Sequence, residues 1–261
     1  MLINPYRFAA GVSLPAPLHW WDLDAITANR VTDLGTKTDS DGWDLLRTKV
    51  GITIDATETI GATSRSVSVF DSSDACFEYS RLAGPVKNIA WDGDNTDAMS
   101  VACWVKLTAI TSVGNFFMTW FAGGTDKMFQ LLTLNNTATD HWYSDIYEAS
   151  GDTIVARDTA ELFGTTGTWY HIAMTFDGTT LTLWLDGAVL ASNTNVDVNS
   201  FNTTDAMPFA IGNASNAKDS TVLCHNGKMA FSGIWDVDIG SAGVAELYNS
   251  GESASYSELW A

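Results

Sequence analysis

Cysteine is scarce in this sequence, and the spacing of the few cysteines excludes two kinds of cross-linked site. The 261 residues include three of them, Cys76, Cys103 and Cys224. An odd number of widely separated cysteines forms neither a disulfide framework nor a zinc site. We therefore expect all three to be small buried hydrophobic residues. Folding in a reducing cytoplasm is the simplest interpretation.

Basic residues are also few, which restricts the partners that the surface can attract. Lys and Arg number 13 against 31 Asp and Glu, so the formal net charge is −18. Such an acidic surface repels phosphates, and the sequence has no basic stripe, so we expect no nucleic-acid partner. Anionic membrane surfaces are disfavoured for the same reason.

Long apolar runs are missing as well. No window approaches 18 consecutive apolar residues, so we expect no membrane insertion. The apolar stretch at 8–18 is short and is broken by Pro15 and Pro17, so the sequence predicts no signal peptide. Residues 1–18 hold three of the five prolines and show no periodicity. We expect them to form an extended arm, followed by a single domain over residues 19–261.

Glutamate is rare, and the acidic residues are mostly aspartate. Only 7 of the 31 are Glu, and Asp favours turns and caps over helix interiors, which indicates β structure with many loops. Ten short apolar runs are separated by clusters of Gly, Asp, Asn and Thr, and they predict an all-β sandwich or barrel. The runs are 66–70, 99–107, 115–122, 127–134, 141–147, 153–157, 168–176, 181–187, 207–212 and 228–239.

One hairpin is predicted in detail from residues 169–187. If Phe176 pairs with Leu181 across the turn at 177–180, side chains alternate between two faces. The first face is apolar and must pack on another sheet; it carries Tyr170, Ile172, Met174, Phe176, Leu181, Leu183 and Leu185. The second face is mixed, and we expect it to be half-solvated or covered by a layer with polar groups; it carries Trp169, His171, Ala173, Thr175, Thr182, Trp184 and Asp186. We expect the facing pair His171 and Asp186 to be structural.

One short helix is predicted near the C-terminus. Ser241 is the candidate N-cap, and Val244, Leu247 and Tyr248 recur at helical spacing before Gly251 ends the run. We expect this helix to lie on the sandwich.

Several motifs along these strands resemble the laminin-G-like jelly rolls of the concanavalin A-like superfamily. They are Trp104; Trp169, His171 and Ala173; Asp177 and Gly178; Trp184, Asp186 and Gly187; Ile211 and Gly212; Gly227, Lys228 and Met229; Leu247 and Tyr248. The resemblance covers 99–251 and extends to 19–98 through LHWWDLD. It implies a two-sheet antiparallel jelly-roll sandwich. Ala230 stands where this family often has an acidic residue, so no metal or ligand role follows from that position.

The opening residues INPYRF, with the glycine-containing stretch after them, resemble the start of tailed-phage virion proteins that carry such jelly rolls. This resemblance implies a structural protein at the virion surface, in a capsid decoration or a tail or fibre, folded in the host cytoplasm. The arm would anchor it to other virion proteins through Leu2, Ile3, Tyr6 and Phe8, and we expect a homo-oligomer. A free-standing carbohydrate-binding, lectin-like module is the alternative.

Glycoside hydrolysis is a third interpretation, because enzymes share this superfamily. The glucanase relatives carry a Glu-x-Asp-x-x-Glu strand, which supplies the two carboxylates that the reaction needs. No such string occurs in this sequence. We therefore expect a protein without catalytic residues.

The loop at 91–97 is the strongest candidate for a metal site. Asp92, Asp94 and Asp97 alternate with Asn and Gly, and oxygen ligands on a tightly curved loop are what Ca²⁺ requires. Cys103 stands at the twelfth position, where an EF-hand has Glu, so the loop is not an EF-hand. Two interpretations stay open: a calcium site, and a solvated turn capped by Asp.

Tryptophan is abundant, with 11 residues, more than a core of this size needs. Exposed aromatic faces beside Asp and Asn side chains are typical of sugar binding, so we expect cell-surface or environmental glycans as ligands. For each aromatic residue the alternative is packing in the core. The candidates are Trp142, Tyr143 and Asp145, with Trp43 and Trp91 near loops and Trp184 on the mixed face.

Overall fold

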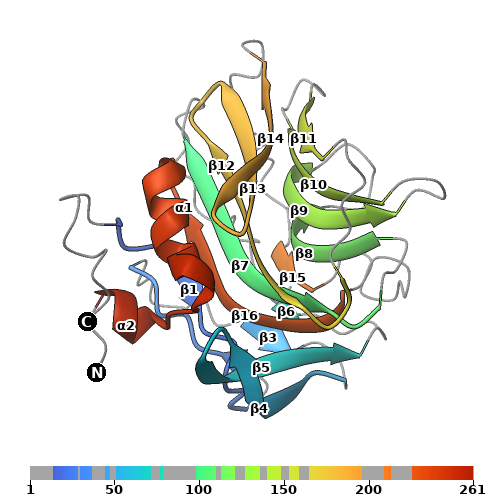
Figure 1. Ribbon diagram of the computed structural model, residues 1–261, viewed down its shortest axis with the longest axis vertical. Helices are drawn as coiled ribbons and strands as arrows, with labels where there is room; N and C mark the ends of the chain where they lie inside the picture. The colour runs from blue at the N-terminus through green and yellow to red at the C-terminus, as the bar shows by residue number, and fades with distance from the viewer. Residues whose placement is uncertain are drawn as a thin grey trace, which may run out of the picture.

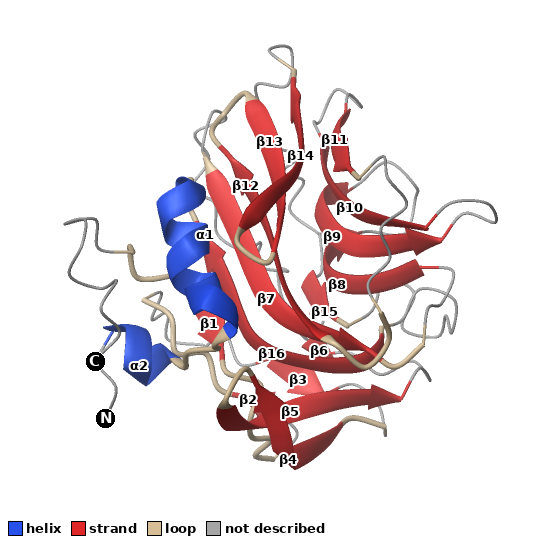
Figure 2. Ribbon diagram, viewed as in Figure 1, coloured by secondary structure: helices blue, strands red, loops and turns tan. Residues whose placement is uncertain are grey.

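Two antiparallel sheets stack face to face, and short helices lie on the outer side of one of them (Figures 1 and 2). The computed structural model describes residues 14–28, 30–36, 45–47, 51–71, 77–78, 98–109, 113–120, 127–135, 140–147, 153–158, 165–195, 209–212 and 225–260. Within these residues, no helix is long and apolar enough to cross a membrane.

The first sheet runs in the order β14-β13-β12-β7-β16-β5-β4, with β1 also pairing with β16. Its strands are β1 (His19–Trp21), β4 (Thr53–Ile60), β5 (Thr63–Asp71), β7 (Met99–Leu107), β12 (Trp169–Phe176), β13 (Thr180–Leu185), β14 (Ala188–Thr194) and β16 (Asn226–Trp235).

The second sheet runs in the order β11-β10-β9-β8-β15-β6-β3-β2. Its strands are β2 (Arg30–Val31), β3 (Leu45–Arg47), β6 (Phe77–Glu78), β8 (Val113–Trp120), β9 (Lys127–Asn135), β10 (Asp140–Tyr147), β11 (Thr153–Arg157) and β15 (Phe209–Ile211). Each of the ten predicted runs overlaps a strand, and the prediction of an all-β, two-sheet antiparallel sandwich is confirmed.

The main core lies between the two sheets and contains the apolar face predicted for the β12–β13 hairpin. Phe176 pairs with Leu181 as expected, and Ile172, Met174 and Leu183 are fully buried between the sheets. Cys103 lies in the same core as a free thiol, and burial raises its pKa well above the usual value. The expected role of a small buried hydrophobic residue is therefore confirmed for Cys103, whereas Cys76 and Cys224 lie outside the described residues.

A second core covers the outer face of the first sheet, where the sequence left half-solvation and coverage as alternatives. Buried tryptophans from the sheet, Trp104, Trp184 and Trp235 among them, pack there with Val244 and Leu247 of the C-terminal helix. The helices are α1 (Gly240–Tyr248), the 3₁₀ turn η2 (Asn249–Gly251) and α2 (Tyr256–Trp260). The central strands of the first sheet are thus covered on both faces, and coverage is the correct alternative there.

The start of α1 differs from the prediction, although the helix itself is confirmed. The helix begins at Gly240 behind Ile239, which makes no side-chain cap, and the Asp238 carboxylate accepts the Gly240 N–H at 2.8 Å. Ser241 is therefore not the N-cap. At the other end Asn249, with φ of 47°, adopts the left-handed conformation that ends the helix before Gly251 is reached.

Part of the expected arm is packed against the sandwich. Leu14 is 4% exposed, its carbonyl accepts the indole N–H of Trp260 at 3.3 Å, and the Pro15 carbonyl accepts that of Trp235 at 2.9 Å. Two indole donors hold this stretch, so residues 14–18 belong to the folded unit and the predicted boundary at residue 18 comes too late. Leu2, Ile3, Tyr6 and Phe8 lie outside the described residues.

Candidate functional site

The candidate site begins on β10, at the outer face of the second sheet. Tyr143, Asp145 and Tyr147 occupy alternate positions of this strand, so their side chains share one face. Trp142 and Ile146 have the opposite parity and are fully buried in the main core. The face that carries the two tyrosines therefore points away from the other sheet.

Asp145 holds both tyrosine hydroxyls. Its carboxylate accepts a hydrogen bond from Tyr143 and from Tyr147, and the Gln130 amide of β9 donates to the Tyr147 hydroxyl at 3.4 Å. Burial, together with the negative charge of Asp145, raises the pKa of each tyrosine well above its usual range. Both phenols therefore stay neutral even at alkaline pH.

Accessibility on this face rises from β9 towards the edge strand β11. Gln130 and Asp145 are 4% and 1% exposed, whereas the two tyrosines are half-buried and Arg157 is exposed. A ligand therefore meets this face at the edge of the sheet, where the tyrosine rings and Arg157 can be reached.

At that edge the two sheets meet in a pocket of about 510 Å³, which we call the rim pocket. The edge strands β11 and β14 lie side by side there (Figure 1). Its described lining consists of Tyr143, Val155, Ala156, Arg157, Ala191, Ser192 and Asn193. The Asn193 side-chain amide donates to the Val155 carbonyl at 2.9 Å and so ties β14 to β11. The described lining combines an aromatic ring, hydroxyl and amide groups and one cation, and it contains no carboxylate.

Two tryptophans that the sequence proposed as sugar platforms are buried, so that part of the prediction is wrong. Trp142 is 0% exposed and packs against Phe116 and Tyr170. Trp184 is 7% exposed and its indole N–H donates to Thr175 Oγ1 at 3.0 Å beneath the C-terminal helix. Neither ring offers a free face to a ligand. Trp43, Trp91, Asp92, Asp94 and Asp97 lie outside the described residues, so the calcium alternative stays a prediction.

The structure adds four residues that the sequence argument missed, Tyr147, Arg157, Ser192 and Asn193. The sequence could have identified Tyr147, because it stands two residues after Asp145 and alternation along the strand puts both side chains on the same face. Ser192 and Asn193 lie on β14, which no apolar run marks. Across the described residues, no group of three or more His, Cys, Asp or Glu side chains is placed to hold a metal ion.

His171 is a structural residue, as expected, although its contact with Asp186 differs from a side-chain pair. The backbone N–H of His171 donates to the Asp186 carboxylate at 2.8 Å. The imidazole contacts the rings of both Trp104 and Tyr248, and burial lowers its pKa to about 3. His171 is therefore a neutral part of the second core at physiological pH.

Comparison with known proteins supports the architecture. Residues 84–244 match the family described as the concanavalin A-like lectin/glucanases superfamily. No match was found among curated protein sequences. Among solved structures, domain 4 of AbnA, a GH43 extracellular arabinanase from Geobacillus stearothermophilus in complex with arabinotriose, has a TM-score of 0.56 at 17% identity, covering 89% of this chain and 98% of that chain.

Two further structures share the fold over a smaller part of their own length. The binding domain of Paraclostridial Mosquitocidal Protein 1 has a TM-score of 0.57 at 11% identity, covering 90% of this chain and 52% of that one. Trypanosoma rangeli sialidase in complex with sialic acid has a TM-score of 0.58 at 14% identity, and the match covers 92% of this chain and 34% of the sialidase chain. At these identities the likeness concerns the fold alone.

Proposed function

This chain belongs to the concanavalin A-like lectin/glucanase superfamily, and from that premise we propose that it is a non-enzymatic carbohydrate-binding protein whose binding site is the rim pocket. The observation that carries the proposal is the lining of that pocket. It brings Tyr143 of β10 together with Ser192 and Asn193 of β14. Aromatic faces stack on the C–H face of a sugar, while hydroxyl and amide groups pair with its hydroxyls.

The arrangement around Tyr143 suits a ligand of weak intrinsic affinity. The hydroxyl of Tyr143 is fixed by Asp145, and Asn193 is fixed by the Val155 carbonyl. Little side-chain freedom is therefore lost when a ligand arrives, which lowers the entropic cost of binding. The relatives solved with arabinotriose and with sialic acid support carbohydrate as the ligand class.

The chemistry of the site supports binding without hydrolysis. Glycoside hydrolysis uses two carboxylates that flank the scissile bond. The described lining of the rim pocket has none, and Asp145 behind it is 1% exposed and accepts hydrogen bonds from both tyrosines. Burial therefore shields this carboxylate from the glycosidic oxygen of a sugar in the pocket.

The test is glycan-array screening of the intact chain, followed by calorimetry on the best ligand. Tyr143→Ala removes the stacking surface, and we expect it to weaken binding about tenfold, or roughly 1.4 kcal/mol. Tyr143→Phe is the matched control, because it keeps the ring and loses only a hydroxyl already bound to Asp145. Equal affinities for wild type and Tyr143→Ala would contradict the site, and release of reducing sugar from any glycan would favour the glucanase-like alternative.

We further propose that this binding module is displayed on a tailed-phage virion as an oligomer, in a capsid decoration, tail or fibre. The proposal rests on the opening residues and on the position of Leu14, whose carbonyl accepts the indole N–H of Trp260 in α2. In Figure 1, α2 lies across the molecule from β11. An anchor formed by residues 1–13 would therefore leave the rim pocket facing outwards. High negative charge would limit self-association of a densely displayed protein.

Two truncations test the virion proposal. A chain that lacks residues 1–13 should fold with wild-type stability but fail to join particles. A chain that lacks residues 1–18 also loses the carbonyls that accept the Trp235 and Trp260 indoles, and it should be less stable. Thermal unfolding and mass spectrometry of purified particles give the two readouts. Full particle incorporation without residues 1–13 would rule out the anchoring role.

A further inference from the structure

Arg157 differs from the other basic residues whose side chains the structure describes. Four such residues are described, and three of them form ion pairs with carboxylates. The pairs join Arg65 to Glu258 at 2.8 Å, Lys106 to Glu58 at 2.9 Å, and Lys228 to Asp55 at 2.7 Å. Arg157 has no ion pair with a described residue, and it is exposed at the rim pocket.

The acidic side chains nearest to Arg157 along the chain and across the sheet are engaged elsewhere. Asp158 directs its carboxylate to the imidazole of His141 and to the backbone N–H of Trp142, each at 3.0 Å. Asp145 accepts the hydroxyls of Tyr143 and Tyr147. Among the described residues the guanidinium of Arg157 therefore has no carboxylate partner, in a chain with an excess of 18 negative charges.

We propose that the rim pocket selects carboxylated sugars, such as uronic acids, and that Arg157 is the residue that recognises their carboxylate. This inference rests on the proposed carbohydrate-binding function and names its ligand class. The planar guanidinium pairs with a carboxylate through two parallel N–H···O bonds. Tyr143 is the cross-strand partner of Arg157 and supplies an aromatic ring next to it. Ser192 and Asn193 of β14 line the pocket as well.

The surroundings make this cation selective. The acidic surface repels anions in general, so an anionic ligand is held only where a local cation compensates. The described lining of the rim pocket has no carboxylate to compete for Arg157. A carboxylate alone would use only Arg157. A sugar ring adds contacts with the rest of the lining, which offers a stacking face and neutral hydrogen-bonding groups.

The experiment compares ligand pairs that differ only in charge. Calorimetry on the intact chain uses oligogalacturonate, a glucuronate-containing oligosaccharide and a sialylated oligosaccharide, each against its neutral methyl ester. We expect at least one acid to bind at least about tenfold more tightly than its ester, the range of one charge-assisted hydrogen bond. Arg157→Gln should weaken binding of the acid more than binding of the ester, so that the preference disappears, and Arg157→Lys should restore only part of it.

Lys106→Gln is the matched control, because it removes the same charge on the outer face of the first sheet and should preserve the preference. The inference is overturned if no acid binds better than its ester, if Arg157→Gln keeps the preference, or if a polyglutamate peptide binds as tightly as the sugars. Ester binding that depends on Tyr143 but not on Arg157, with no preference for acids, would leave the carbohydrate-binding function standing. Absence of binding to every sugar would remove both proposals.

Discussion

Glu58 lies between two lysines on the outer face of the first sheet. Its carboxylate contacts Lys228 Nζ at 2.5 Å and Lys106 Nζ at 2.9 Å, and Lys228 also reaches Asp55 at 2.7 Å. The Glu58 side chain is 12% exposed. Burial alone raises the pKa of this carboxyl, but hydrogen bonds from Lys228 and Lys106 outweigh it and lower the pKa to about 2.

This cluster predicts an acid-dependent loss of stability. Because the folded-state pKa of Glu58 lies below its ordinary value of 4.5, the stabilisation is complete above about pH 4.5 and is lost as the pH falls towards 2. We expect Glu58→Gln to lower the free energy of unfolding by about 1–3 kcal/mol at pH 7. Between about pH 4.5 and pH 2 the free energy of unfolding should then decrease less than in the wild type. Urea unfolding at a series of pH values measures both.

Glu246→Gln on α1 provides the control for this prediction, since its side chain forms no ion pair with a described residue. It should leave both the stability at pH 7 and its acid dependence close to wild type. If the two variants behave alike, the lysine contacts of Glu58 contribute nothing to stability.

At the scale of single residues, the sequence could have separated the correct site residues from the wrong ones. Strand alternation puts Trp142 on the same side as Ile146 and opposite to Tyr143 and Asp145, so these residues could not share one binding face. Alternation alone does not tell which side is buried. The burial of Trp184 was harder to foresee, because its cover comes from α1, which follows it by more than fifty residues.

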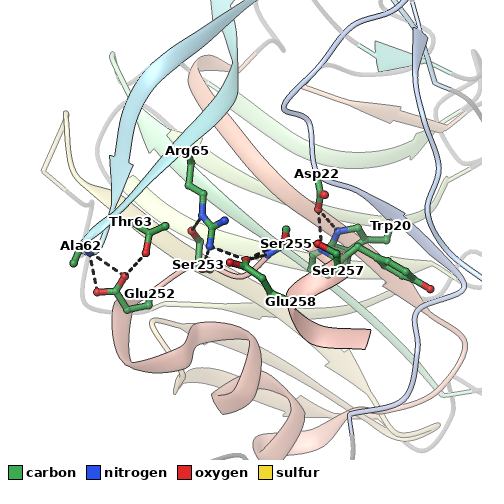
Figure 3. Close-up of polar contacts among 11 residues, drawn as sticks. Trp20, Asp22, Ala62, Thr63, Arg65, Glu252, Ser253, Ser255, Ser257 and Glu258 are labelled. Atoms are coloured by element: carbon green, nitrogen blue, oxygen red, sulfur yellow. Dashed lines mark hydrogen bonds and ion pairs between the residues drawn. The ribbon is translucent and has the colours of Figure 1, made fainter. Parts of the chain in front are cut away.

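At the scale of elements, the C-terminal segment, Glu252–Trp260, fastens distant parts of the chain (Figure 3). The Glu252 carboxylate accepts the Ala62 N–H at 2.8 Å, and Arg65 donates to the Ser253 carbonyl at 2.6 Å and to Glu258 at 2.8 Å. These contacts join the segment to the β4–β5 hairpin. Asp22 accepts both the Trp20 indole N–H at 2.6 Å and the Tyr256 N–H at 3.1 Å, so the same segment is fixed beside β1.

Trp260 is the apolar contact of this segment, and its removal should loosen the segment. Its ring packs edge-on against Trp20 with centroids 5.1 Å apart. We expect Trp260→Ala to lower the free energy of unfolding by about 1–3 kcal/mol and to increase binding of a hydrophobic dye, because Trp20 gains access to water. Ser257→Ala, which removes one exposed hydroxyl of α2, should change neither quantity. An unchanged dye signal for Trp260→Ala would show that Trp20 stays covered without it.

β14 is one of six described strands that no predicted apolar run marks, and the lack of such a run explains why the rim pocket was missed too. β14 follows β13 through Asp186 and Gly187, whose φ angles of 50° and 78° form a tight two-residue turn between Leu185 and Ala188. The Asp-Gly pair is a turn signal that the sequence contained. The following residues, AVLASNT, do not alternate cleanly, because half of an edge strand faces water.

At the scale of the whole molecule, the sandwich could be predicted because its signals are local. Short apolar runs, turn residues and family motifs each occupy a few residues and add up to two sheets. The helix was expected to lie on the sandwich, but the full layer on the outer face of the first sheet could not be predicted, because residues 14–18 and 240–260 are far apart in the sequence and meet there. The rim pocket has the same origin, since Arg157 and Asn193 come from different sheets.

The contact between Leu14 and Trp260 also determines how the protein would respond to mechanical tension. A pull applied to both ends of the chain would load that contact first and peel α2 away from β1. Part of the load would also reach β16, because the Pro15 carbonyl accepts the Trp235 indole N–H and β1 pairs with β16. The contact between Leu14 and Trp260 would therefore break first. The rim pocket lies on the other side of the molecule and would keep its shape.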